Sequence, residues 1–183
     1  PHFTDRRQRQ MCIRDRGNAS SVNELYSHKQ IQDRLVNMAA EITLNYKDDD
    51  EIVVICLLKG GFMFTADLVR MIIRKIYIDF MTVSSYGNEF ESSGMIDIKQ
   101  DISMNIEGKK IILINDVVDS GFTMNAIIDH LNLKKPKEIK TCCLLHKRKV
   151  NVPIDFVGFE CPDKYVVGYG IDAEEEYRNL PFI

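Results

Sequence analysis

The stretch from Ile111 to Thr123 constrains the fold of this chain more than any other segment. Four aliphatic residues run directly into an acidic segment, then into Ser-Gly-Phe-Thr, and a helical pattern of apolar residues follows from Met124 to Leu133. This order predicts a buried strand, a polar loop at its carboxyl end, and a helix that begins at the loop. The first N–H groups of a helix have no internal partner and the helix dipole favours negative charge, so this loop is suited to binding an anion.

Two kinds of ligand contact fall in the loop. The hydroxyls of Ser120 and Thr123 can donate to a phosphate, and the small Gly121 lets the backbone close around it. Asp116 and Asp119 cannot bind a phosphate directly, and they suit sugar hydroxyls, a metal ion or a base nitrogen instead. The alternative is that these side chains only cap the helix. Two acids, with two hydroxyls around a small residue, favour a binding site over a simple cap.

The rest of the chain repeats the alternation of strand and helix. The predicted strands are 52–58, 77–85, 111–115, 139–145, 156–159 and 165–169, and the segment 95–106 can pair as a hairpin. The predicted helices are 31–46, 62–76 and 122–133. Such alternation predicts an α/β fold, with a mostly parallel twisted sheet flanked by helices on both faces. Ligands in these sheets bind beyond the carboxyl ends of the strands, where the loops after residues 58, 85, 115 and 169 are expected to converge.

Composition limits the classes of protein to which the chain can belong. Of its 183 residues, 45% are hydrophobic and 28% are charged, and we expect one globular domain over residues 21–183. The net charge of −3 does not indicate a nucleic-acid partner. No apolar run approaches the roughly 18 residues that span a membrane, so no membrane contact is expected. Without a recognisable secretory signal, C-x-x-C pair or zinc spacing, the five cysteines are expected to be reduced thiols of a cytoplasmic protein.

Residues 1–20 differ from the remainder. Five arginines occur before Gly17, periodicity is weak, and the chain does not begin with Met. We expect a non-native or disordered extension that is not part of the fold. A flexible native arm is the alternative, and a basic arm that binds nucleic acid has no support elsewhere in the chain.

Two further loops follow predicted strands. Lys59-Gly60-Gly61 is either a simple strand exit or a backbone that presents N–H groups to a diphosphate, with Lys59 beside it as a cation. The polar run from Tyr86 to Gly94, which follows Ser84-Ser85, is either a surface loop or a mobile lid that closes over the site and excludes water.

Two segments nearer the carboxyl terminus carry candidate ligand contacts. Lys147 follows a strand, either as part of a solvated charge run or as a contact to a carbonyl or phosphate. The segment from 163 to 178 is either an edge strand with an acidic tail or a set of ligand contacts. There Tyr165 can stack on a flat base, Asp172 can hold a metal, and Arg178 can neutralise a diphosphate.

Taken together, these segments resemble the hypoxanthine-guanine phosphoribosyltransferases of purine salvage, especially the short bacterial members. The resemblance spans about residues 25–183 and is carried by LLKGGFMFTADL (57–68), VSSYG (83–87), NDVVDSGFT (115–123), DFVGFE (155–160), KYVVGYGID (164–172) and EYRNLPF (176–182). It implies a type I phosphoribosyltransferase fold with a small hood and a mobile lid loop. The implied reaction joins hypoxanthine or guanine to 5-phosphoribosyl diphosphate (PRPP), giving IMP or GMP and diphosphate, with Mg²⁺ as cofactor. A homodimer or homotetramer is also implied.

The resemblance assigns roles at the PRPP end of the site. The 5′-phosphate would be held by Ser120, Gly121, Phe122 and Thr123. The ribose hydroxyls would meet Asn115 and Asp116, directly or through Mg²⁺. The diphosphate would meet Lys59, Gly60 and Arg178, and its Mg²⁺ would meet Asp172. In the family the peptide bond entering this lysine, here Leu58–Lys59, can be cis.

The resemblance also assigns roles at the purine end. Asp119 would be catalytic, near N7 of the purine, where it accepts or donates a proton. Lys147 would contact the purine O6, Tyr165 would stack on the base, and the Val166 backbone would read its edge. Ser85 and Tyr86 would contact substrate at the base of the lid.

One residue departs from the family pattern. The family usually has Glu-Asp where this chain has Asn115-Asp116. Because Asn carries no charge, we expect weaker Mg²⁺ contact and reduced PRPP affinity rather than lost chemistry. The alternatives to this transferase are a non-catalytic PRPP sensor, a transferase for another 6-oxopurine such as xanthine, and an unrelated nucleotide-binding domain. The last lacks both of its usual glycine motifs here.

Overall fold

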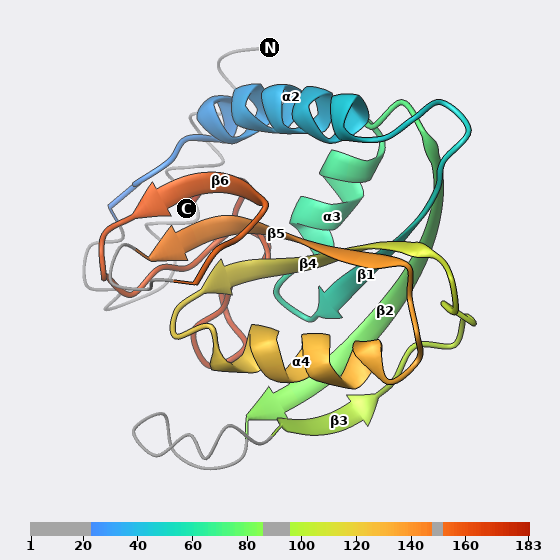
Figure 1. Ribbon diagram of the computed structural model, residues 1–183. Helices are drawn as coiled ribbons and strands as arrows, with labels where there is room; N and C mark the ends of the chain where they lie inside the picture. Colours follow the sequence, from blue (N-terminus) through green and yellow to red (C-terminus); the bar gives the residue numbers. More distant parts are fainter. Residues whose placement is uncertain (1–22, 86–95, 148–151) are drawn as a thin grey trace.

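The apolar runs of the chain form a six-stranded sheet, which the computed structural model describes within residues 23–85, 96–147 and 152–183 (Figure 1). The strands are β1 (Glu51–Leu58), β2 (Lys75–Ser85), β3 (Ile96–Gln100), β4 (Lys110–Val118), β5 (Glu138–Lys147) and β6 (Phe156–Cys161). Their order is β3-β2-β1-β4-β5-β6, and every neighbouring pair is parallel except β2 and β3. The predicted mostly parallel sheet is confirmed, and within the 95–106 segment the expected pairing is confirmed for Ile96–Gln100, which pairs antiparallel with β2.

Helices cover both faces of the sheet, as predicted. The helices α2 (His28–Asn45) and α3 (Phe62–Val69) lie on one face and α4 (Phe122–Asn132) on the other (Figure 1). Successive residues of β4 divide between the two layers: Ile112 and Ile114 pack with α2 and α3, whereas Ile111 and Leu113 pack with α4. Strands buried on both faces explain why the central runs are continuously apolar rather than alternating.

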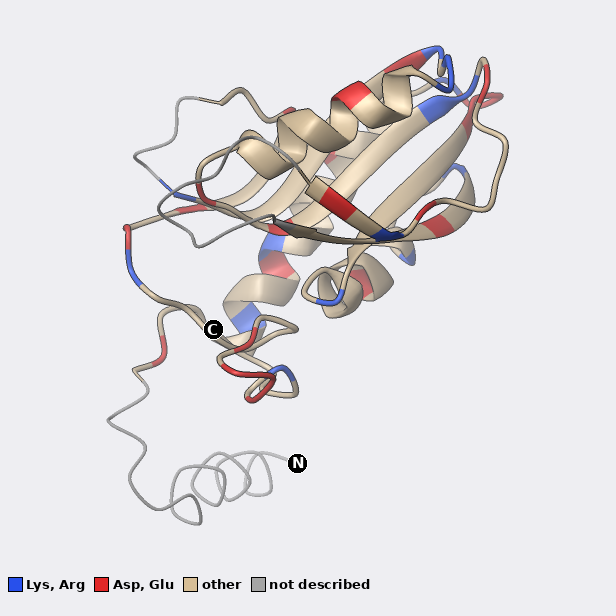
Figure 2. Ribbon diagram, turned by 90° about the horizontal axis from the view of Figure 1, so that it is seen from below, with Lys and Arg blue, Asp and Glu red and all other residues tan. Residues whose placement is uncertain are grey.

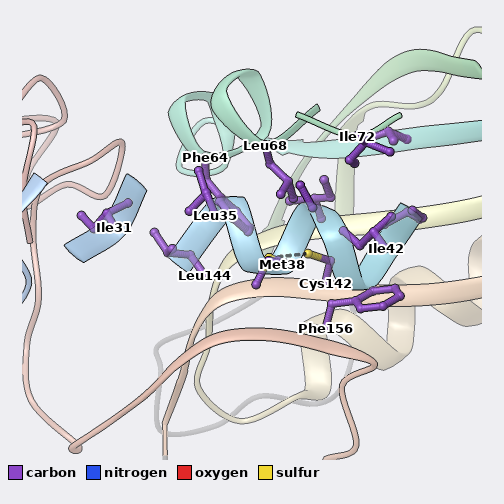
Figure 3. Packing of buried hydrophobic residues seen from close by; sticks show 14 of the residues in the cluster. Ile31, Leu35, Met38, Ile42, Phe64, Leu68, Ile72, Cys142, Leu144 and Phe156 are labelled. Carbon is purple, nitrogen blue, oxygen red and sulfur yellow. Dashed lines mark hydrogen bonds between the residues drawn. The ribbon is translucent and has the colours of Figure 1, made fainter. Parts of the chain in front are cut away.

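The helix α2 combines a strong start signal with a buried apolar face. The Ser27 hydroxyl accepts from the Gln30 N–H at 3.1 Å, and the Gln30 side chain accepts from the Ser27 N–H at 2.8 Å, which forms a capping box. Figure 3 shows Leu35 and Met38 among the buried side chains of this layer, with the Cys142 thiol 3.7 Å from the Met38 sulfur. Complete burial of such a side chain stabilises the fold by about 1.5–3 kcal/mol, so this face holds α2 on the sheet.

The predicted helix 62–76 is too long. α3 ends at Val69, and β2 begins at Lys75, opposite Glu51 of β1. Met71 and Ile72 continue the helical spacing of apolar residues, but their N–H groups bond to carbonyls three residues back, as in a tightening final turn. Parallel pairing with β1 then takes over, which local periodicity does not reveal.

The predicted strand 165–169 is wrong. This segment bends back on itself, with left-handed φ values of 104° at Gly168, 49° at Tyr169 and 99° at Gly170. The Gly168 N–H bonds to the carbonyl of Ile171 at 2.9 Å, which closes a tight turn. The run of aromatic and β-branched residues Tyr165-Val166-Val167 suggested a strand, whereas Gly168 and Gly170 mark the turn that forms.

The carboxyl-terminal segment returns to the start of the described chain. The N–H groups of Leu25 and Tyr26 donate to the Ile183 carbonyl at 2.6 and 2.9 Å, and the Tyr26 ring stacks on Phe159 at 4.2 Å between centroids. The expected hood stays a prediction. The extension 1–20 and the 86–94 lid lie outside the described residues. In the described part of the chain, no helix combines the length and apolar character needed to cross a membrane.

Candidate active site

The junction of β4 and α4 has the geometry of an anion site. Gly121 stands at the amino-terminal cap of α4 with φ of 78°, and a Cβ there would lie 2.3 Å from a methyl carbon of Val152. Only glycine fits both the conformation and the space. The cap residue Gly121 has no side chain with which to cap the helix, and the Phe122 N–H donates to the Ser120 hydroxyl at 3.4 Å. The first turn of α4 therefore presents N–H groups and the positive end of the helix dipole beside the Ser120 and Thr123 positions.

Asp116 and Asn115 lie at the edge of this junction in different surroundings. Burial raises the pKa of Asp116 above its ordinary value, and the nearby Asp172 carboxylate adds to this, whereas the Val117 N–H and the Arg178 guanidinium oppose it. The Asn115 amide folds back on its own strand. It accepts from the Asp116 N–H at 2.9 Å and donates to the Val117 carbonyl at 3.0 Å. A glutamate in its place could not make the second bond.

Three loops approach one another around Asp116. A Cβ at Gly60 would lie only 1.9 Å from Asp116 Oδ2, and a Cβ at Gly170 would lie 2.4 Å from the Gly60 carbonyl oxygen. Glycine at both positions is what permits this contact between the loop after β1, the end of β4 and the carboxyl-terminal segment. The predicted convergence of these loops is confirmed, and the Leu58–Lys59 peptide bond is cis.

Asp119 is joined to Lys147 across the ends of β4 and β5. Lys147 Nζ lies 2.9 Å from Asp119 Oδ2 and 3.8 Å from Asp163 Oδ1. The Lys147 side chain is only 13% exposed, whereas that of Asp119 is 68% exposed. The ammonium group is therefore fixed, and the carboxylate is open to a ligand.

A second charge network joins the loop after β1 to the carboxyl-terminal turn. Lys59 Nζ lies 2.8 Å from Glu175 Oε2, and Glu175 Oε1 lies 3.3 Å from Arg178 Nη2. The same Arg178 nitrogen lies 3.1 Å from Asp172 Oδ1, and Arg178 Nη1 donates to the Gly170 carbonyl at 2.8 Å. These hydrogen bonds to Lys59 and Arg178 hold the pKa of Glu175 below its ordinary value. Figure 2 shows that such charges gather mainly in loops, at strand ends and on the helices, while most of the sheet is tan.

The structure describes three of the four remaining candidate residues, which are Tyr165, Val166, Ser85 and Tyr86. Tyr165 is 81% exposed, so its ring faces are open, and Val166 is half-buried against the α2 layer. Ser85 is the last residue of β2, and Tyr86 lies outside the described residues.

Residues 21–174 match the phosphoribosyl transferase domain family. The chain belongs to this family. It is 50% identical over 160 residues to the hypoxanthine-guanine phosphoribosyltransferase of Aquifex aeolicus, covering 86% of this chain and 90% of that protein. A crystal structure of the hypoxanthine-guanine phosphoribosyltransferase of Bacillus anthracis, with HEPES in its active site, superposes with a TM-score of 0.84 at 44% identity, over 88% of this chain and 96% of that one. The hypoxanthine phosphoribosyltransferase of Trypanosoma cruzi gives a TM-score of 0.83 at 33% identity, over 91% of this chain and 92% of that one. The predicted resemblance and fold class are confirmed.

The carboxylates described at this site suit a metal ion that arrives bound to a ligand, and they do not form a complete metal-binding site of their own. Within the described ranges, no three His, Cys, Asp or Glu side chains form a metal-binding cluster. Mg²⁺ commonly uses only one or two carboxylates and completes its shell with water and substrate phosphates. Asp116 and Asp172 fit that requirement, because each carboxylate lies in the field of the other and a cation between them would relieve their repulsion.

Two members of the site were missed from the sequence. Glu175 was read as part of an acidic tail, although its spacing of three residues from both Asp172 and Arg178 was a signal for a compact charged turn. Gly170 gave no signal that it packs on Gly60, since that contact joins segments more than a hundred residues apart.

Proposed function

We propose that this chain is a hypoxanthine phosphoribosyltransferase, which transfers the 5-phosphoribosyl group of PRPP to hypoxanthine, and also to guanine, giving IMP or GMP and diphosphate. The observation that carries this proposal is the meeting of three loops around Asp116, beside the start of α4 at Gly121, in a chain half identical to a hypoxanthine-guanine phosphoribosyltransferase. The single domain is taken to span residues 21–183.

The proposed PRPP end uses the α4 junction and the network around Arg178. The N–H groups and hydroxyls of residues 120–123 would bind the 5′-phosphate, and Asn115 and Asp116 would orient the ribose. Lys59, the Gly60 backbone and Arg178 would receive the diphosphate. Asp116 and Asp172 would hold Mg²⁺, which when bound neutralises negative charge on the diphosphate. Support comes from the half-buried Asp116 beside Gly60, and from an arginine already held by a carbonyl and a carboxylate.

The proposed purine end uses the Asp119–Lys147 pair. Lys147 would donate to the purine O6, which favours 6-oxo over 6-amino bases, while Tyr165 stacks on the ring and the Val166 backbone reads its edge. The C1′–O bond breaks and its electron pair leaves with the diphosphate. The purine nitrogen then supplies the electron pair for the new C1′–N bond, and Asp119 takes the proton from N7. The 2.9 Å separation of Asp119 and Lys147 supports a single ring meeting both groups.

The test is diphosphate release from PRPP and Mg²⁺ with hypoxanthine, guanine, xanthine and adenine in parallel. We expect turnover with hypoxanthine and guanine and none with adenine. Asp119→Asn should lower kcat by about 10²–10⁴-fold, as expected for loss of a proton acceptor. Asp163→Asn is the matched control, because it removes the same charge from the other side of Lys147, and it should change kcat by less than about threefold.

Three outcomes would contradict the proposal or redirect it. Turnover with xanthine alone would move the substrate to that 6-oxopurine. PRPP binding with no turnover on any purine would identify a sensor. Equal effects of Asp119→Asn and Asp163→Asn would remove the catalytic role of Asp119.

We further propose a homodimer or homotetramer in the cytoplasm. The work on the Trypanosoma cruzi enzyme concerns the role of its C-terminal region in oligomeric state. In this chain Ile78 and Phe80 are 44% and 39% exposed at alternate positions of β2, so both lie on one face of that strand. Light scattering on the purified chain tests the assembly. Substitution of both residues by Ser should shift the mass toward the monomer.

A further inference from the structure

The geometry points to Glu175 as a tethered anion that competes with diphosphate for Lys59 and Arg178. The inference rests on the proposed function, since it takes those two cations as the diphosphate site. Lys59 Nζ lies 2.8 Å from one Glu175 carboxylate oxygen, and Arg178 Nη2 lies 3.3 Å from the other. One carboxylate thus bridges two cations, using one oxygen for each, and Glu175 is 116 residues from Lys59 in the sequence. A diphosphate that contacts both cations requires the same space and the same donors.

The three side chains differ in how easily they can move. Glu175 and Lys59 are 64% and 63% exposed, whereas Arg178 is only 19% exposed. The carboxylate is therefore the outer and replaceable partner, and it can swing into solvent without uncovering the core. Arg178 is the fixed element of the site.

Arg178 does not depend on Glu175 for its position. Its Nη1 donates to the Gly170 carbonyl at 2.8 Å, and its Nη2 lies 3.1 Å from Asp172 Oδ1. Its buried Nε has no hydrogen-bond partner in the described part of the chain. Guanidinium has five N–H donors, so this arginine keeps its anchors and has donor capacity left when the Glu175 carboxylate moves away.

The turn that carries Glu175 aims the carboxylate at the site. Glu174, Glu175 and Tyr177 have left-handed φ values of 50°, 67° and 70°, a backbone conformation that residues other than glycine rarely adopt. The Glu175 N–H donates to Asp172 Oδ2 at 2.9 Å, so the backbone of this residue is fixed to a proposed metal-binding acid. A fixed backbone with an exposed side chain keeps the local concentration of the competing anion high, as expected for a tethered ligand.

The expected effect of this competition on the affinity for diphosphate is large enough to measure. An ion pair with an exposed carboxylate such as that of Glu175 changes an equilibrium by no more than a few-fold, so the two pairs should weaken diphosphate binding by about two- to tenfold. Glu175 would thereby raise the KM for PRPP and speed the departure of product diphosphate. A residue that only positioned Arg178 would have the opposite effect, because its removal would weaken diphosphate binding.

The experiment is calorimetric binding of inorganic diphosphate with Mg²⁺ to the full chain, and to its Glu175→Gln and Glu174→Gln variants. Glutamine keeps the length of the side chain and removes its charge, and Glu174 is the exposed neighbour that controls for net charge. We expect Glu175→Gln to tighten diphosphate binding by about two- to tenfold relative to Glu174→Gln, and to lower the KM for PRPP in proportion. Thermal unfolding confirms that each variant is folded.

The possible failures can be told apart. If the parent chain turns over PRPP with hypoxanthine but Glu175→Gln binds diphosphate no more tightly than Glu174→Gln, the inference is overturned and the function stands. Weaker binding by Glu175→Gln also overturns it, in favour of a positioning role. If the parent chain neither binds diphosphate nor uses PRPP, the proposed function fails and the inference falls with it.

Discussion

Gly60→Ala is the substitution with the clearest expected consequence for the site. The new Cβ would lie 1.9 Å from Asp116 Oδ2, where ordinary contact begins at 3.4 Å, so the carboxylate has to move by about 1.5 Å. The φ of Gly60 is outside the left-handed region, so alanine adds no backbone penalty of that kind. A displacement of about 1 Å at a reacting centre can cost a hundredfold in rate. We therefore expect kcat/KM for PRPP to fall by about 10²-fold, equivalent to about 2.7 kcal/mol, in steady-state assays with hypoxanthine saturating.

Two controls isolate the contact with Asp116. Gly108→Ala introduces a methyl group that meets no atom within 4 Å, although φ is 69° there, so it should cost some stability and leave kcat/KM unchanged. The second control is Gly60→Ala in an Asp116→Ala background. Its calorimetric affinity for PRPP should be less than about twofold below that of Asp116→Ala alone. A folded Gly60→Ala variant with kcat/KM within about threefold of the parent would refute the reasoning. So would an equally large loss of affinity in the double variant.

Three other substitutions test separate parts of the account. Asn115→Glu should lower the KM for PRPP by adding charge beside Asp116. It should also lower the free energy of unfolding, measured with denaturant, by about 0.5–1.5 kcal/mol through the lost bond to Val117. An unchanged KM would contradict the proposed ribose and Mg²⁺ contact. Because burial raises the pKa of Asp116, the folded chain binds more protons than the unfolded chain, and stability falls as pH rises through that range. Asp116→Asn in metal-free buffer should therefore be more stable than the parent at pH 7, with a difference that disappears in acid, and equal stability throughout would contradict the burial argument. Tyr169→Phe removes the hydroxyl that donates to Asp67. The free energy of unfolding should fall by about 1–3 kcal/mol, and the KM for PRPP should rise. A change in neither quantity would show that this bond does not hold the turn beside Gly170.

The parts of the fold that depend on local pattern were predictable. The run from Ile111 to Thr123 predicted a strand, a loop and a helix, and β4 and α4 lie there because both faces of the strand are buried and Gly121 permits the tight helix start. Continuous apolar runs predicted the parallel strands for the same reason. The Ser27 cap and its Gln30 partner account for the helix expected from residue 31 onward.

The parts of the fold that depend on tertiary contacts were not predictable from local sequence patterns. α3 ends seven residues before its predicted end because β2 pairs with β1, and pairing partners are not visible in local periodicity. The aromatic and β-branched residues of the 165–169 segment are typical of a strand, yet Gly168 and Gly170 make it a turn that packs on another loop. In the candidate site, individual acids and glycines were predicted from motifs. Their meeting around Asp116, and the bridging position of Glu175, required the three-dimensional arrangement of the loops.

The most direct test of the central claim is a crystal structure of this chain with IMP, diphosphate and Mg²⁺. The account predicts the 5′-phosphate on the N–H groups of residues 120–123 and the purine O6 on Lys147. It also predicts the diphosphate on Arg178 and Lys59, with the Glu175 carboxylate turned away. Nucleotide bound away from the start of α4, or diphosphate bound with Glu175 still bridging Lys59 and Arg178, would contradict it.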